Sequence, residues 1–301
     1  MILNYEHIGC DLCGSANYKV RYRKPDVVRW INQFEFPVVE CRDCGLVYVN
    51  PRPTPESMAA YYPKGYHSNR DKERHRLRYE VEVSHLPPLN NERVLDIGCA
   101  EGDFLMHLKD KFSGIQAFGC DYYSDKVKSP DIKFFNKALN DCNFENSFFD
   151  VITAWAVFEH LHYPDKYFAE VHRILKSGGR FIFQVTNSES LFSKKCYSED
   201  IPRHLFHFSK KTLSSYAEKH GFKFRKILYD NSVFDGRGYG AFRILFWKLL
   251  NITWEDLYYK NINVFQHAVL KFGSLIDRIV FFTDWERRLG MSGMIIAEFQ
   301  K

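Results

Sequence analysis

The chain has 301 residues, of which 45% are hydrophobic and 26% are charged. This length and composition allow a large buried core, in one large domain or two modest ones, and they exclude a wholly disordered chain. The net charge, 42 − 37 = +5, is mild, and the sequence has no dense basic run of the kind that binds nucleic acid.

Neither an export signal nor a membrane span is expected. Residues 1–20 lack an uninterrupted apolar core followed by small residues, so they do not resemble a signal peptide. The most apolar stretches, 242–250 and 264–282, are interrupted by charged residues, which argues against a transmembrane helix. We therefore expect a cytoplasmic protein, in which cysteines bind metal more readily than they form disulfides.

Two CxxC pairs near the N-terminus predict a zinc module over residues 1–50. Each pair directs two thiolates to the same side of a tight knuckle, and two knuckles complete a tetrahedral site. Gly14 and Gly45 follow the knuckles, where a positive φ helps the turn to close. Residues 18–22 and 36–39 are predicted as short strands. Because four thiolates leave no open position, the zinc is expected to be structural. The predicted ligands are Cys10, Cys13, Cys41 and Cys44.

Residues 51–90 are predicted to form a helical connector. Thr54 is a suitable N-cap for a helix that begins at Pro55. Residues 69–85 are charged and compatible with a second helix, which the proline pair at 87–88 ends.

A strand–helix alternation begins at Glu92 and predicts a doubly wound parallel sheet. A domain over 91–235 is completed by a last strand in 291–301, and 236–290 forms a mainly helical insertion between them. The expected fold is α/β, with a seven-stranded Rossmann-like sheet. The predicted strands are 93–97, 117–121, 132–136, 150–154, 180–186, 222–229 and 294–299, and the predicted helices are 103–111, 165–175 and 212–220.

The turn after the first of these strands carries small residues that would let a ligand approach the backbone. It differs from a dinucleotide-binding loop, because Asp103 stands where the last glycine is required. Asp121 ends the second strand, where a carboxylate accepts hydrogen bonds from both ribose hydroxyls. Tyr122 follows and could pack against adenine. Glycines at such a turn also serve packing alone, and this alternative stays open.

The ordered motifs VLDIGCAEGDF, GCD, FDVITAWAVFEHL and ILKSGGRFIFQV resemble those of class I S-adenosylmethionine-dependent methyltransferases. Two further segments, CxxC…CxxCGLVYVNPRP and DIPRHLFHFSKKTL, are similar to one branch of that family, whose bacterial members often act on sugars or surface glycans. The resemblance covers about residues 5–230 and the last strand. It implies S-adenosylmethionine as cofactor, and the residues that it places in the cofactor site are Asp96, Gly98, Ala100, Gly102, Asp121, Ala138, Leu139, Ala154 and Trp155.

Methyl transfer to a hydroxyl needs alignment and a base, and candidates follow the fourth and fifth strands. His204 is the preferred base, followed by His207 and His160, and Arg203 could hold an acidic group of the substrate. Each histidine could instead be a packing or helix-entry residue. A second metal held by Glu159, His160 and His204 is a further alternative.

The aromatic-rich insertion 236–290 has three interpretations: helices that cover the core, a lid over a bulky acceptor, or a peripheral contact at the inner face of a membrane. The function expected is methylation of a hydroxyl on a sugar or glycan-linked small molecule. The alternatives are methylation of ribosomal RNA, which the mild charge disfavours, and a non-enzymatic cofactor-binding role. The sequence leaves the acceptor and the oligomeric state open.

Overall fold

The computed structural model describes residues 3–62, 72–124, 127–194, 200–230, 240–283 and 285–301. The chain forms two compact units, each assembled from three segments, and each is described here on its own. The ribbon unit contains Met1–Lys64, Thr186–Ser209 and Tyr229–Ile295, and the sheet unit contains Gly65–Val185, Lys210–Leu228 and Ile296–Lys301. These units cut across the linear division that the sequence predicts, because both the 186–209 segment and the insertion belong with the N-terminal module.

A seven-stranded sheet forms the core of the sheet unit, with strand order β12-β13-β10-β9-β6-β7-β8. Neighbours from β10 to β8 are parallel, as the strand–helix alternation predicts. The predicted Rossmann-like fold is therefore confirmed. The strands are β6 (Arg93–Ile97), β7 (Gln116–Cys120), β8 (Lys133–Phe135), β9 (Phe149–Trp155), β10 (Leu175–Thr186), β12 (Lys223–Tyr229) and β13 (Met294–Gln300).

The last strand, β13, runs antiparallel to β10. The amide of Gly178, near the start of β10, donates to the carbonyl of Lys301 at 2.8 Å. At the opposite end, the amide of Asn187 donates to the carbonyl of Gly293 at 2.8 Å. The chain segments after β10 and after β12 therefore both leave from the edge at which the parallel strands end, which is the ligand-binding edge of doubly wound sheets.

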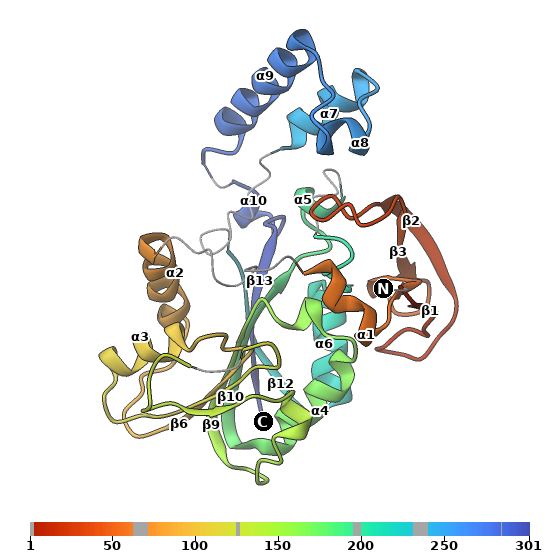
Figure 1. Cartoon of the computed structure of the whole chain (residues 1–301). Coiled ribbons are helices and arrows are strands. Elements are labelled where there is room, and N and C mark those ends of the chain that lie inside the picture. The colour runs from red at the N-terminus through yellow and green to blue at the C-terminus, as the bar shows by residue number, and fades with distance from the viewer. Residues whose placement is uncertain (1–2, 63–71, 125–126, 195–199, 231–239, 284) are drawn as a thin grey trace. The chain divides into compact units, whose positions relative to one another are not determined.

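Helices cover both faces of this sheet (Figure 1): α2 (Lys72–Ser84) and α3 (Asp103–Lys111) lie on one face, and α4 (Pro164–Ile174) and α6 (Lys210–Lys219) on the other. On the second face Phe168 of α4 stacks on Tyr216 of α6, with ring centroids 4.6 Å apart. Phe168 also lies 5.7 Å from the ring of Phe183 on β10. Apolar residues at helical spacing thus join helix to sheet.

The ribbon unit holds a four-stranded sheet of order β11-β4-β3-β2. The predicted ribbon strands are confirmed as β2 (Tyr18–Lys24) and β3 (Phe36–Cys41), and they are followed by β4 (Val47–Val49). The fourth strand, β11 (Phe206–His207), comes from a segment far later in the chain. Smaller elements of this unit are β1 (Tyr5–Glu6), β5 (Arg52–Pro53), α1 (Pro55–Met58), η1 (Ala59–Tyr61) and α5 (Leu191–Lys194). The predicted cap of α1 is present, since the Thr54 hydroxyl accepts from the amide of Ser57 at 3.4 Å.

The insertion is helical, as predicted, with α7 (Ala241–Leu249), α8 (Trp254–Tyr258), α9 (Val264–Val280) and α10 (Trp285–Arg288). Its α8 packs on the ribbon, because Tyr258 stacks on Trp30 with centroids 5.1 Å apart. The Lys24 ammonium lies 5.0 Å from the ring of Trp254. Among the residues that the structure describes, every helix is too short or too polar to cross a bilayer.

Candidate functional site

The loop between β6 and α3 folds back onto the end of β7. The amide of Gly98 donates to the carbonyl of Cys120 at 2.8 Å, and the amide of Ala100 donates to Oδ2 of Asp121 at 2.9 Å. Ala100 has φ of 49°, in the left-handed region that disfavours a side chain. A non-glycine residue held in this conformation indicates a loop whose shape the surrounding hydrogen bonds impose.

The two glycines of this loop serve packing. A Cβ atom on Gly98 would lie 2.6 Å from Cγ2 of Val157, and one on Gly102 would lie 3.0 Å from Cδ1 of Ile132. The first distance is a collision, and the second is a tight contact from which the Ile132 side chain would have to move, so a larger residue at either position would disturb the packing of the loop. Both positions are therefore tightly packed, and their predicted role in cofactor binding, which stays a prediction, would belong to the backbone that they shape.

Asp121 is held rigidly at the end of β7. Its Oδ1 accepts from the amides of Tyr123 at 2.7 Å and Ser124 at 2.9 Å, in addition to the Ala100 bond to Oδ2. A carboxylate has about four lone-pair positions, so acceptor capacity remains for a diol. Tyr122 is 66% exposed beside it and contacts Tyr123 edge to face, with centroids 5.1 Å apart.

The other predicted cofactor residues vary in exposure. Asp96 is buried and accepts from the Thr153 hydroxyl at 2.7 Å, and its burial raises the pKa of its carboxyl group well above the usual value. Ala154 is buried in β9. Ala138 is half-buried at the start of η2 (Leu139–Asp141), and Leu139 is buried. Asp96 and Leu139 thus support the site from the core.

Two polar side chains at the ends of β9 and β10 lack hydrogen-bond partners within the described part of the chain. Gln184 is fully buried, and both atoms of its amide are unsatisfied. Its neighbour in the sheet is Trp155, whose indole Nε1 is also unsatisfied. Burying such groups without partners costs about 1–3 kcal/mol each, which favours a ligand or water here. Sequence reasoning missed Gln184, because a glutamine within an apolar strand belongs to no motif.

The predicted catalytic histidines are divided between the two units. His160 belongs to the sheet unit, where it ends η3 (Phe158–His160) just after β9 and is half-buried. His204 and His207 belong to the ribbon unit, with ring centroids 6.3 Å apart. His207 lies within β11, is 1% exposed and pairs with Val47. Burial lowers the pKa of His204 to about 4. The shared metal that would join Glu159 and His160 to His204 stays a sequence prediction.

Arg203 is fully buried and its guanidinium is occupied by protein groups. It donates to Oδ2 of Asp200 at 2.8 Å, to Oδ1 of Asp26 at 3.1 Å and to the carbonyl of Tyr61 at 2.6 Å. Its donors are therefore directed at the ribbon unit itself. This placement disfavours the predicted contact with an acidic substrate group and assigns Arg203 to holding the 200–208 segment on the N-terminal module.

The four N-terminal cysteines meet as predicted. All four sulfur atoms lie within 4.8 Å of one another, with Cys10 and Cys44 at 3.4 Å and Cys13 and Cys41 at 3.6 Å. With zinc–sulfur bonds of about 2.3 Å, the sulfurs of a tetrahedral site lie about 3.8 Å apart, so the cluster fits this ion. The positive φ expected after each knuckle is present, at +75° for Gly14 and +86° for Gly45.

Residues 68–227, more than half of the chain, match the family model described as a methyltransferase domain. The chain belongs to this family. Together with the sheet topology and the loop at the end of β6, the methyltransferase domain indicates an S-adenosylmethionine-dependent enzyme.

Curated relatives of this methyltransferase match it in part. It is 32% identical over 105 residues to a sterol 4-C-methyltransferase of Caenorhabditis elegans, covering 31% of this chain and 30% of that protein. A Methanocaldococcus jannaschii protein is 32% identical over 142 residues, with 47% and 58% covered. A tRNA (guanine-N(7)-)-methyltransferase of Prochlorococcus marinus is 27% identical over 173 residues, with 50% and 77% covered. The chain thus spans less than two thirds of the length of the first two.

Among solved structures, one with a TM-score above 0.5 shares the fold. A chain from the complex of the Haloferax volcanii Trm112 methyltransferase activator with a methyltransferase has a TM-score of 0.53 and 18% identity, covering 76% of this chain and 91% of that chain. A methyltransferase of Listeria monocytogenes has a TM-score of 0.47 and 17% identity, covering 74% and 97%.

Proposed function

We propose that this methyltransferase transfers a methyl group from S-adenosylmethionine to a hydroxyl of a sugar or glycan-linked small molecule. One observation supports this acceptor class above others: the two segments that resemble the sugar-modifying branch are bonded to each other. The amide of Val49 donates to the carbonyl of Leu205 at 2.9 Å, and Phe206 pairs with Tyr48 across β4 and β11. The two branch-specific motifs therefore form neighbouring strands of one sheet.

The residues at the end of the sheet would hold the cofactor. Asp121 would accept from the ribose hydroxyls, and the backbone around Ala100 would approach the nucleoside. Trp155 and Gln184 offer an indole N–H and an amide for polar groups of the cofactor or acceptor. Bound S-adenosylmethionine supplies an electrophilic methyl carbon, so the protein has to align the acceptor and take up its proton.

We propose His160 as the base, ahead of His204. A base works best when its pKa lies near the working pH, and burial holds the pKa of His204 near 4, which makes it a weak proton acceptor at neutral pH. His207 lies in β11 and is 1% exposed, so its imidazole is shielded from a soluble acceptor. His160 ends η3, five positions after Trp155, the last residue of β9, at the ligand-binding edge of the sheet.

The test measures release of S-adenosylhomocysteine with a panel of nucleotide-activated sugars as acceptors. With a sugar that the enzyme methylates, the activity of His160→Asn is then compared with that of the matched control His162→Asn, two positions later. The first variant is expected to lose about 10²–10⁴-fold in kcat while retaining cofactor affinity, and the control is expected to retain activity. If no sugar of the panel is methylated, the proposed acceptor class is refuted. If His160→Asn keeps its activity, the assignment of His160 as the base is refuted.

RNA is the second candidate, favoured by the tRNA-modifying relative that matches half of this chain. Filter binding of total tRNA across a salt series separates the candidates, because phosphate contacts make affinity steeply salt-dependent. Binding that persists at physiological salt, with methyl incorporation into the RNA, would favour this alternative over the sugar.

We also propose that the four-cysteine cluster binds one structural zinc ion. The sulfur spacings and the two knuckles support this, since the cluster has the donor set and closed geometry of such sites. Metal analysis of the purified protein is expected to find one zinc per chain, lost in Cys41→Ser and retained in Cys142→Ser, whose thiol lies in the sheet unit. A folded wild type without zinc would contradict the proposal.

A further inference from the structure

The helices α7 and α9 form a self-contained pair. Ile244, Trp247 and Leu270 are buried between them and the turn that follows α7. Gly273 allows close approach, because a Cβ atom there would lie 2.8 Å from the Cα atom of Arg243. Asp277, which is 1% exposed, caps α7 by accepting from the amides of Phe242 at 2.9 Å and Arg243 at 3.2 Å. One side of each helix thus forms the shared core of the pair.

The other side of α9 presents large apolar residues to solvent. Their spacing of three, four or seven places them along one stripe of the helix. Soluble proteins seldom expose apolar residues in such a continuous array without a binding function. The exposed members are Phe265 at 67%, Phe272 at 57%, Leu275 at 52% and Ile279 at 70%, and on α7 Leu245 at 49% and Leu249 at 68%.

The stripe continues from one helix to the other. Phe246 of α7 stacks on Phe272 of α9, with ring centroids 6.3 Å apart. Phe246 lies three positions before Leu249, and Leu249 lies four positions after Leu245, so the three side chains are neighbours on the surface of α7. The stack therefore connects the exposed residues of α7 with the stripe of α9. We call this continuous surface the α7–α9 face.

Positive charge borders the α7–α9 face. Arg243 and Lys248 on α7 and Lys271 and Arg278 on α9 are all exposed. The single acidic residue of these two helices, Asp277, is buried as the cap of α7. The face therefore combines apolar side chains with exposed cations, which is the composition of helices that lie in the interface of an anionic bilayer.

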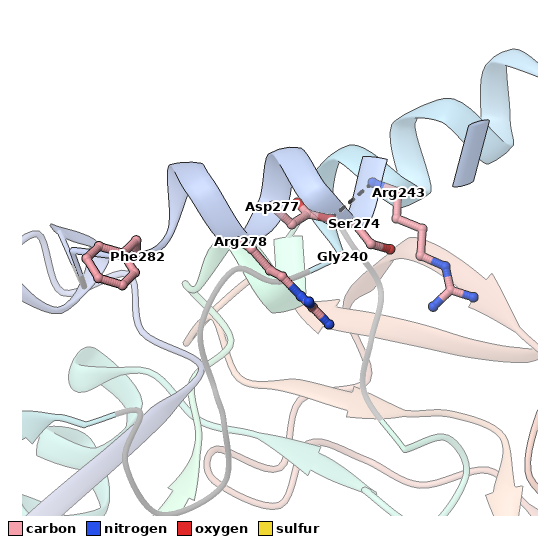
Figure 2. A pocket seen from close by; sticks show the side chains of 6 residues that line it. All are labelled: Gly240, Arg243, Ser274, Asp277, Arg278 and Phe282. Atoms are coloured by element: carbon pink, nitrogen blue, oxygen red, sulfur yellow. Dashed lines mark hydrogen bonds between the residues drawn. The ribbon is translucent and has the colours of Figure 1, made fainter. Parts of the chain in front are cut away.

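A pocket beside this face is suited to a phosphate group. Arg243 and Arg278 line a cavity of about 550 Å³, and both guanidinium groups extend from the same side of the helix pair (Figure 2). The cavity is also lined by Gly240, Ser274, Phe282 and Asp277, whose carboxylate accepts from two amides of α7. Guanidinium groups bind phosphate through paired charged hydrogen bonds. Phe282, which is 76% exposed, adds an apolar ring at the edge of the cavity.

We propose that the α7–α9 face docks on an anionic phospholipid bilayer, with its apolar stripe among the acyl chains and its arginines at the lipid phosphates. The charge selects the lipid surface over a second copy of the chain, because two such faces would bring four cations of each copy together without an exposed acidic partner on α7 or α9. This docking is independent of the acceptor proposed above.

The test is co-sedimentation of the full chain with phosphatidylcholine vesicles that contain or lack phosphatidylglycerol. The wild type is expected to pellet with the anionic vesicles. Its affinity for the neutral vesicles is expected to be lower by about tenfold or more. Phe272→Asp/Ile279→Asp should abolish pelleting, and Arg243→Glu/Arg278→Glu should remove the preference for anionic lipid. Leu77→Asp replaces an equally exposed apolar residue on α2 and should pellet like the wild type.

Circular dichroism of each variant checks that the helices persist. A wild type that stays in the supernatant with both vesicles would overturn the proposal. So would a Phe272→Asp/Ile279→Asp variant that is folded and still pellets. Light scattering provides the third outcome: a wild-type dimer that this variant converts to a monomer, without vesicle binding, would show that a second copy covers the face.

Discussion

Replacing Arg203 by methionine tests whether this residue holds the protein together or holds its substrate. The guanidinium is fully buried and bonds to Asp26, Asp200 and the carbonyl of Tyr61. Methionine fills similar space and removes every donor. The variant would leave the buried Asp26 carboxylate without its cation, and the Tyr61 carbonyl without the Arg203 donor.

The structure sets the expected size of the effect. Breaking a buried ion pair from one side costs about 3–5 kcal/mol, because the remaining charge stays buried. Asp26 keeps two backbone donors, the amides of Val28 and Arg29 at 3.1 Å each. The side chain of Asp200 is 24% exposed and can be hydrated. Both compensations favour the lower end, so we expect about 3 kcal/mol loss in the free energy of unfolding.

Urea denaturation followed by fluorescence measures this loss. The control is Arg180→Met, which breaks a surface pair with Glu298 at 3.2 Å and is expected to cost under about 1 kcal/mol. Adding Asp26→Asn to the Arg203 variant removes the stranded charge and should recover part of the loss. A variant of Arg203 with unchanged stability and a raised KM for the acceptor would refute this reasoning and restore the substrate contact.

Three further predictions concern the ends of the strands and the ribbon. Asp121→Ala should weaken S-adenosylmethionine binding by about 10–100-fold in calorimetry, since it removes charged hydrogen bonds, and unchanged affinity would exclude the diol contact. Ala100→Gly should raise the free energy of unfolding by up to about 1 kcal/mol by relieving the left-handed backbone, and a loss of stability would show that the methyl group packs. Burial lowers the pKa of His204 to about 4 from an ordinary value near 6.5, so the neutral form is favoured in the folded state. Stability should be full above about pH 6.5 and fall toward pH 4, with a smaller fall in His204→Gln.

Most of the fold could be predicted from periodic and local features of the sequence. The strand–helix alternation predicted all seven strands of the sheet, and the helix bounds agree to within two residues for α3, α4 and α6. The cysteine knuckles were equally local, since a turn closed within five residues depends on Gly14 and Gly45 and on little else. Such signals are readable because burial and backbone conformation repeat over short distances.

The candidate site was less predictable, because its character depends on partners far along the chain. Arg203 contacts Asp26 across 177 positions of sequence, and no local motif around either residue predicts this ion pair. The sequence made His207 a candidate base, and only the pairing of β11 with β4 showed that this residue is buried in a sheet. Gln184 became notable only when its neighbours in the sheet proved unable to satisfy its amide.

By itself, then, the sequence determined the elements, their order and the family motifs, which follow from side-chain periodicity and turn chemistry within a few residues. Tertiary structure decided which polar groups are paired, which histidines are buried, and that one side of α9 stays uncovered. Those properties depend on desolvation, and the extent to which a side chain is desolvated is set by segments that only folding brings together.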